Sequence, residues 1–140
     1  MPDIISEINW LAVIAGGVIH MVIGGLWYGP IAGKAWMAEV GMTEEEIKAA
    51  GNPWVSILKS FFSTAILTFG MAYLFIATGM IEAGWQHGAL VGAFLSLFIV
   101  GAATYPNYTF ENKTLRHFLI HIGDTTVAMT LIGAMLTVWR

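Results

Sequence analysis

Residues 8–28 read INWLAVIAGGVIHMVIGGLWY, and His20 is the only side chain in this run that can carry a positive charge. An α-helix rises about 1.5 Å per residue, so a bilayer core of about 30 Å needs about 20 predominantly apolar residues. The run therefore predicts a membrane-spanning helix. Asp3 and Glu7 precede it where a signal peptide would carry Lys or Arg, which favours a helix that is retained.

Three further stretches satisfy the same length rule, at residues 54–80, 84–105 and 114–139. The composition agrees, because 57% of the residues are apolar, 11% are charged and the mean hydropathy is +0.73, outside the range of soluble domains. Amphipathic rings collect at the headgroup level, and tryptophans stand at the predicted helix ends: Trp10, Trp27, Trp54, Trp85 and Trp139. The sequence thus predicts an all-α integral membrane four-helix bundle, with residues 1–140 forming a single transmembrane domain.

The charge pattern excludes some functions and predicts an orientation. The net charge is −3 without a basic stripe, so no nucleic acid is expected as a partner. Basic residues gather on or near the connections between helices one and two and between helices three and four: Lys34, Lys48, Lys59, Lys113 and Arg116. The positive-inside rule then places both connections in the cytoplasm and both termini outside.

The connection at residues 29–53 is the one segment with soluble character. Thr43 followed by Glu46 forms a capping-box pattern, and Gly51 to Pro53 would stop a helix. A short cytoplasmic helix over residues 44–50 is therefore expected. Its acidic first turn is interpreted as a solvated face, because carboxylates suit the positive end of a helix.

A resemblance to a known family appears in the first 40 residues. The matching letters are NWLAV at 9–13, GLWYGP at 25–30, GK at 33–34 and WM at 36–37. This pattern resembles the bacterial membrane family catalogued as domain-of-unknown-function family 1761. The resemblance implies a bacterial inner-membrane protein with four helices. It implies no reaction, ligand or catalytic residue, because the family is uncharacterised.

Small residues recur at spacings that let helix backbones approach closely. They are Gly16 and Gly24 on the first helix, and Gly84, Gly88, Gly92 and Ser96 at intervals of four on the third. Close van der Waals contact drives helix association in lipid, so these stripes predict helix–helix interfaces. Two such faces favour a homo-oligomer within the lipid bilayer, with packing inside one chain as the alternative.

Four polar residues stand out within the spans. His117, His121 and Asp124 are separated by four and three residues, which places them on one face of the last helix. His20 lies at a similar depth, about 12 Å from the cytoplasmic end of the first helix. A cluster of His20, His121 and Asp124 is expected if these helices touch, whereas His117 is expected to reach toward the headgroups.

Three interpretations of this cluster follow from its chemistry. A histidine beside a carboxylate can relay protons, two imidazoles and a carboxylate can bind a divalent metal, or the groups can hydrogen-bond and fix the packing. Cysteine is absent and no nucleophile–base pair is visible, so an enzyme is not favoured. The preferred hypothesis is a small transport or channel-like protein for protons or a cation. The alternative is a non-catalytic structural or accessory subunit that binds lipid or other membrane proteins.

Overall fold

The computed structural model describes residues 3–139, and within that range it contains helices and no strand. Four helical segments are long and apolar enough to cross a membrane: Trp10–Ile31, Pro53–Ala77, Trp85–Phe110 and Leu115–Val138. Seven of their eight bounds lie within three residues of the predicted ones. The predicted all-α four-helix membrane bundle is confirmed.

Two of the four spans contain a wider helical turn. The first consists of α2 (Trp10–Leu26) and the π-helical η1 (Trp27–Ile31), and the third of α6 (Trp85–Phe94), the π-helical η3 (Leu95–Gly101) and α7 (Ala102–Phe110). The second and fourth are α5 (Pro53–Ala77) and α8 (Leu115–Val138). The remaining elements are short: α1 (Ile4–Glu7), α3 (Gly33–Val40), α4 (Glu44–Ala49) and η2 (Met80–Glu82).

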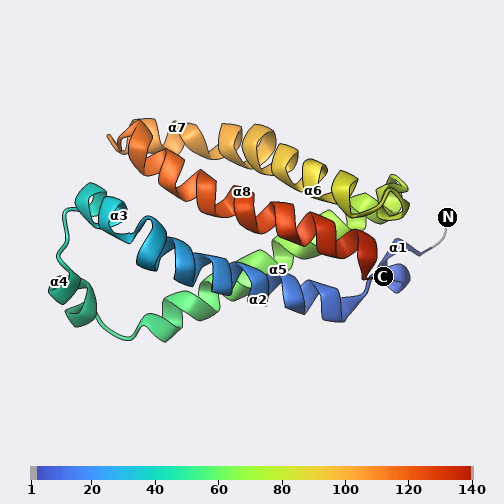
Figure 1. The fold of residues 1–140 in the computed structure, drawn as a ribbon, viewed down its shortest axis with the longest axis horizontal. Coiled ribbons are helices and arrows are strands. Elements are labelled where there is room, and N and C mark those ends of the chain that lie inside the picture. The colour runs from blue at the N-terminus through green and yellow to red at the C-terminus, as the bar shows by residue number, and fades with distance from the viewer. Residues whose placement is uncertain (1–2, 140) are drawn as a thin grey trace.

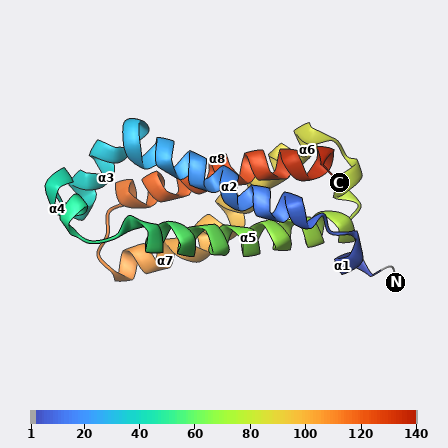
Figure 2. The ribbon, with the colours of Figure 1, turned by 90° about the horizontal axis from the view of Figure 1, so that it is seen from below.

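The bundle has two distinct ends. Both chain termini and the α5–α6 connection lie at one end, and α3, α4 and the α7–α8 turn lie at the other (Figures 1 and 2). We call the corresponding parts of the molecule the terminus half and the loop half. Chain order thus alternates between the two ends, as the four predicted spans require.

The fourth span is the central helix of the bundle. It packs against α6 on one side and against α2 on the other, and α2 in turn packs against α5 (Figure 1). In its most apolar 18-residue stretch, 44% of the residues are buried, against 22–28% in the corresponding stretches of the other three spans. The outer helices expose large apolar side chains over most of their surface, as helices facing lipid do.

The apolar core lies in the terminus half. Phe75 of α5 and Ile132 of α8 are completely buried there, next to Met129. Glycines let α6 approach α8: a Cβ added to Gly88 would overlap the Gly133 carbonyl, and one at Gly92 would overlap the Met129 carbonyl. Backbones this close gain van der Waals contact that lipid cannot replace.

Two of the residues predicted to pack helices together, Gly24 and Gly84, have open space beside them. Gly16 packs against Thr68 of α5, whereas a Cβ added to Gly24 meets no described atom within 4 Å. Gly84 also has open space around it, and its φ of 85° marks it as the turn residue that begins α6 rather than a packing residue. Gly16, Gly88 and Gly92 are covered within one chain, so they do not call for a second copy.

The third span is longer than predicted. The proline at position 106 was expected to end it at Tyr105, but the helix continues to Phe110. A proline in a membrane helix removes one hydrogen bond, which packing against a neighbouring helix can offset. Tyr105 and Tyr108 supply that packing, because both rings stack edge-to-face on Phe118 of α8.

The predicted short helix of the 29–53 connection is α4, which spans Glu44–Ala49 and ends one residue before its predicted bound. Its capping box is present: the Glu46 backbone N–H donates to Thr43, and the Thr43 backbone N–H donates to the Glu46 carboxylate at 2.7 Å. Preceding it, α3 is held to the start of α8, where the Thr114 hydroxyl donates to the Glu39 carboxylate.

Candidate functional site

A hydrogen-bonded trio joins three spans near mid-membrane. The imidazole Nε2 of His20 on α2 lies 2.9 Å from Oδ2 of Asp124 on α8, and its Nδ1 lies 2.5 Å from the Thr64 hydroxyl on α5. The structure brings His20 and Asp124 together because α2 and α8 pack against each other. Thr64 completes the trio, although nothing in the sequence distinguished it from the other threonines.

The partners of Thr64 determine which imidazole nitrogen carries a proton. The single hydroxyl proton of Thr64 is donated to the Ser60 carbonyl, 3.0 Å away in its own helix. Its oxygen must therefore accept the proton of His20 Nδ1. This tautomer leaves Nε2 facing the carboxyl group, so a hydrogen bond between His20 Nε2 and Asp124 Oδ2 requires a proton on one of these two atoms.

The carboxyl group of Asp124 is buried and only half satisfied. Its side chain is 7% exposed, against 24% for His20. Oδ2 meets the imidazole, but Oδ1 has no hydrogen-bond partner among residues 3–139. A buried polar atom without a partner is costly and needs an explanation, and sites that receive a proton, water or ligand provide one.

His121 and His117 form a separate group. The Tyr108 hydroxyl hydrogen-bonds His121 Nδ1, and the His121 ring lies 4.8 Å from that of His117 and 5.8 Å from that of Tyr28. His117 is 6% exposed, so it does not reach toward the headgroups as expected. The reason is that α7 places Tyr108 over this face of α8.

The predicted cluster of His20, His121 and Asp124 is thus divided between two environments. Within residues 3–139 no group of three or more His, Asp or Glu side chains lies close enough to hold a metal ion. The divalent-metal interpretation required His121 to join the other two, and the structure instead directs it toward Tyr108. Metal binding at these three residues therefore has no geometric support.

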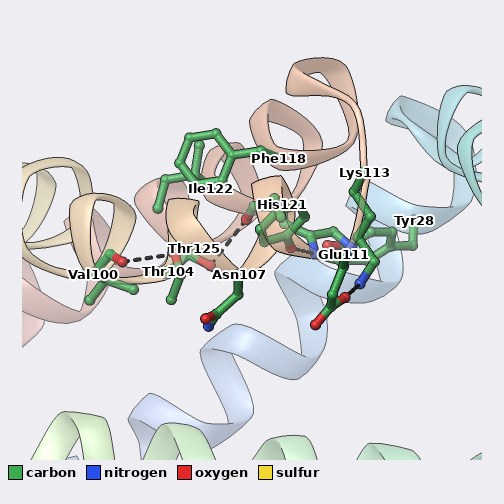
Figure 3. Close-up of a pocket in the computed structure, with 11 residues that line it drawn as sticks. Tyr28, Val100, Thr104, Asn107, Glu111, Lys113, Phe118, His121, Ile122 and Thr125 are labelled. Carbon is green, nitrogen blue, oxygen red and sulfur yellow. Dashed lines mark hydrogen bonds and ion pairs between the residues drawn. The ribbon is translucent and has the colours of Figure 1, made fainter.

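A polar cavity of about 360 Å³ adjoins the histidine group in the loop half (Figure 3). His121 and Tyr28 lie on one side of it, and the Glu111–Lys113 ion pair lies on the same side as Tyr28 (Figure 3). The complete lining is Tyr28, Val100, Thr104, Asn107, Tyr108, Glu111, Lys113, Phe118, His121, Ile122 and Thr125.

A second and larger cavity of about 560 Å³ reaches the His20–Asp124 pair. Its lining is His20, Met21, Gly24, Gly25, Tyr28, Trp54, Ser56, Ile57, Ser60 and Asp124. Trp54 stands at the start of α5 in the loop half, whereas His20 and Asp124 lie halfway along their helices. The cavity therefore extends from the loop end of the bundle to its middle, and Tyr28 lines both cavities.

The kink of the first span positions Tyr28 between the cavities. Gly29 has φ −94° and ψ −106°, outside the helical region, and Pro30 follows it. Trp27 anchors this turn to α8, because its indole N–H donates to the Ile120 carbonyl at 2.9 Å and its ring packs on Gly123. Wide helical turns of this kind are frequent at functional sites.

Sequence reasoning missed the inward role of Trp27, Tyr28 and Tyr108. All three are of the residue types that gather at the headgroup level, where Trp27 was placed as a helix-end tryptophan. For Trp27 and Tyr28 a signal was present, because the Gly29-Pro30 pair that follows them indicates a kink, and kinks in membrane helices often border cavities.

These features define a multi-pass helical membrane protein with an ionisable pair in its interior. The chain belongs to the DUF1761 family, described as proteins of unknown function, whose family model matches residues 11–137. The match confirms the resemblance seen in the first 40 residues and extends over His20, Thr64 and Asp124. Comparison with curated proteins and with solved structures gives no significant match.

Proposed function

We propose that this protein transports protons across the membrane and that the His20–Asp124 pair is the proton-binding site. The observation that carries the proposal is the contact of His20 Nε2 with Oδ2 of the buried Asp124, at 2.9 Å and beside a cavity. Ionisable groups inside membrane spans are costly, and they usually pair or line an ion pathway.

The pair has two neutral forms, and both suit the membrane interior. Either His20 is an imidazolium beside an ionised Asp124, or a neutral imidazole beside a protonated Asp124. Loss of the shared proton leaves Asp124 as a net negative charge, and gain of a second proton leaves His20 as a net positive charge. An imidazole beside a carboxylate can therefore take up and release a proton.

Access to the pair is asymmetric. The larger cavity approaches it from the loop half, whereas Thr68, Phe75 and Ile132 fill the terminus half with completely buried side chains. This arrangement supports a transporter that opens to one side at a time rather than an open channel. Transport would require α2 and α8 to part in the terminus half in a second conformation.

The distribution of basic residues supports an orientation of the protein in the membrane. The basic residues Lys34, Lys48, Lys59, Lys113 and Arg116 belong to the loop half. We infer from the positive-inside rule that this half faces the cytoplasm of a bacterial inner membrane and that both termini lie outside. The conformation described here would then load protons from the cytoplasmic side. A homo-oligomer is not required by this proposal, because all members of the trio belong to one chain.

Proton flux into proteoliposomes tests the proposal. A pyranine-loaded vesicle should acidify faster with the wild-type protein than without protein when an inward proton gradient is applied. Asp124→Asn should abolish that difference, because an amide keeps the shape of the carboxyl group but cannot ionise. Asp124→Glu should retain part of the flux.

The matched control is an exposed histidine outside the pair. His20→Gln should abolish flux, whereas His87→Gln should not, because His87 is exposed and, among the described residues, hydrogen-bonds the Ala83 carbonyl in its own turn. Equal flux by wild type and Asp124→Asn would disprove the proposal. Absence of flux from all variants, with folding intact, would instead favour the structural alternative, in which the trio only fixes helix packing.

A further inference from the structure

We propose that the larger cavity is a binding site for a lipophilic organic cation, held by the Asp124 carboxylate in exchange for the shared proton. This inference rests on the proposed proton site and names the class of substrate that the site would exchange with protons. The ligand would be a monovalent ammonium or phosphonium ion with an apolar body.

The size and lining of the cavity fit a small organic molecule. Its volume of about 560 Å³ falls within the range of about 300 to 1,000 Å³ that ligand pockets occupy. Met21, Ile57 and Trp54 supply apolar and aromatic surface. Ser56 and Ser60 provide hydroxyl groups along the α5 wall.

The charge of the cavity selects the sign of the ligand. Among residues 3–139, Asp124 is the one acidic residue in the lining, and no Lys or Arg belongs to it. Its Oδ1 lacks a partner among the described residues, so the carboxyl group can accept a further donor or a positive charge. An anionic ligand would be repelled by the carboxylate, and a neutral one could not replace the His20 imidazolium as its compensating charge. The aromatic faces of Trp54 and Tyr28 suit a cation further.

Two glycines create the space for this ligand. A Cβ added to Gly24 or Gly25 meets no described atom within 4 Å, and both residues line the cavity wall on α2. These glycines differ from Gly16, which packs tightly against Thr68 one turn before His20. The glycines of α2 thus change from packing residues to cavity-forming residues on passing His20.

The exchange of cation for proton balances in charge. Before binding, the imidazolium of His20 compensates the Asp124 carboxylate. When the organic cation takes over this compensation, an adjacent imidazolium is disfavoured by like-charge repulsion. The proton on Nε2 is therefore released to water through the cavity, and the site remains neutral. Each bound cation should release about one proton, because only one proton is shared by the pair.

Titration of the purified full-length protein with tetraphenylphosphonium tests this inference. The probe carries a permanent charge and no proton, so any proton released comes from the protein. Calorimetry in two buffers of different ionisation enthalpy measures both Kd and the protons released. We expect saturable binding with proton release, and no Asp124-dependent binding of the neutral analogue triphenylphosphine oxide.

Matched glycine variants separate the cavity from general effects on folding. Gly24→Leu should weaken tetraphenylphosphonium binding by at least about tenfold, because it fills the cavity and leaves the His20–Asp124 pair unchanged. Gly70→Leu is the control, since Gly70 also has open space around it but lies outside the cavity. Asp124→Asn should weaken binding by a similar factor. If that variant does not fold, binding to Gly24→Leu still tests whether the cavity is the site.

Three results would overturn the inference: no binding to wild type, equal binding to Asp124→Asn, or unchanged binding to Gly24→Leu. Proton flux measured on the same samples tests the proposed proton transport separately from the binding of an organic cation. Asp124-dependent flux without probe binding refutes the organic cation alone, whereas probe binding without flux refutes transport alone. Competition by phosphatidylethanolamine, but not by phosphatidylglycerol, would identify a lipid amine as the ligand, and lack of competition would indicate a soluble amine.

Discussion

The helices pack closely in the terminus half of the bundle, whereas cavities lie between them in the loop half. In the terminus half, Gly88 and Gly92 bring α6 against the backbone of α8, and buried Phe75 and Ile132 fill the remaining space. In the loop half, a Cβ added to Gly24 or Gly25 would meet no described atom within 4 Å, and two cavities lie between the helices. Glycine therefore allows close helix packing in the terminus half and lines a cavity in the loop half.

The difference between the halves concerns polar groups as well. Buried threonines in the terminus half bond carbonyls of their own helices, as where Thr68 donates to the Thr64 carbonyl at 2.8 Å and Thr137 to the Ala134 carbonyl. The ionisable groups of the interior, His20, His117, His121 and Asp124, begin at the boundary and extend into the loop half. A closely packed apolar half beside a half with cavities is the arrangement that a one-sided proton site needs.

The largest effect expected from this comparison is on folding. Gly92→Leu should lower the free energy of unfolding by about 3 kcal/mol or prevent folding, because the side chain would enter the backbone of α8 at Met129. Gly24→Leu should change it by less than about 0.5 kcal/mol, because the site is open. Unfolding of both variants in mixed micelles, followed by circular dichroism, measures the contrast. Comparable losses for the two would show that the halves do not differ in packing.

A second prediction concerns the cost of the buried pair. Replacing both partners, in the double variant His20→Leu with Asp124→Leu, should leave stability unchanged or raise it by up to about 2 kcal/mol, because apolar side chains often stabilise a site relative to a buried ion pair. The single variant Asp124→Leu should lose about 1 to 2 kcal/mol, since it leaves the imidazole without its partner. Thermal unfolding compares them. A double variant less stable than the single one would indicate that the pair exists for stability.

The sequence predicted the bundle well because hydropathy and length alone define spanning helices. It also predicted that His20 and Asp124 could meet, since both lie at similar depth on helices that turned out to touch. Depth can be counted along a helix, but rotation about the helix axis relative to a neighbour cannot. For that reason His121, only three residues from Asp124, was assigned to the wrong partners.

The cavities and the kink were harder to foresee. Gly24 has the spacing of a packing glycine, and only the path of α5 away from it reveals that it lines a cavity. Tyr28 and Tyr108 have the composition of a headgroup belt, and the wide turn at Gly29 directs Tyr28 inward. Local composition indicates which residues can sit at an interface, whereas the geometry of neighbouring helices decides which of them do.

A third, smaller effect distinguishes two threonines on neighbouring turns of α5. Thr64→Val should cost about 1 kcal/mol, because His20 Nδ1 loses its acceptor. It should also shift the pH profile of proton flux, since the imidazole tautomer is no longer fixed. Thr68→Val should cost less, because Thr68 bonds only the Thr64 carbonyl of its own helix. Stability and proton flux measured between about pH 5 and about pH 8 test both. A pH profile unchanged in Thr64→Val would argue against the assigned tautomer.

The smallest effect is expected outside the membrane, at α4. The backbone N–H and hydroxyl of Thr43 hold the pKa of the Glu46 carboxyl below its ordinary value of 4.5. Because the pKa is lower in the folded state, this stabilisation is present above pH 4.5 and is lost as the pH falls further and the carboxylate is protonated. Hydrogen-exchange protection of the Glu46 amide should therefore decline as the pH falls below 4.5 in the wild type. Thr43→Ala should show low protection throughout, because the capping box is missing.

Proton flux should be unchanged in this variant, since α4 contributes no residue to either cavity. A flux that fell with the cap would extend the functional region beyond the membrane and remove the boundary on which the comparison of the two halves depends.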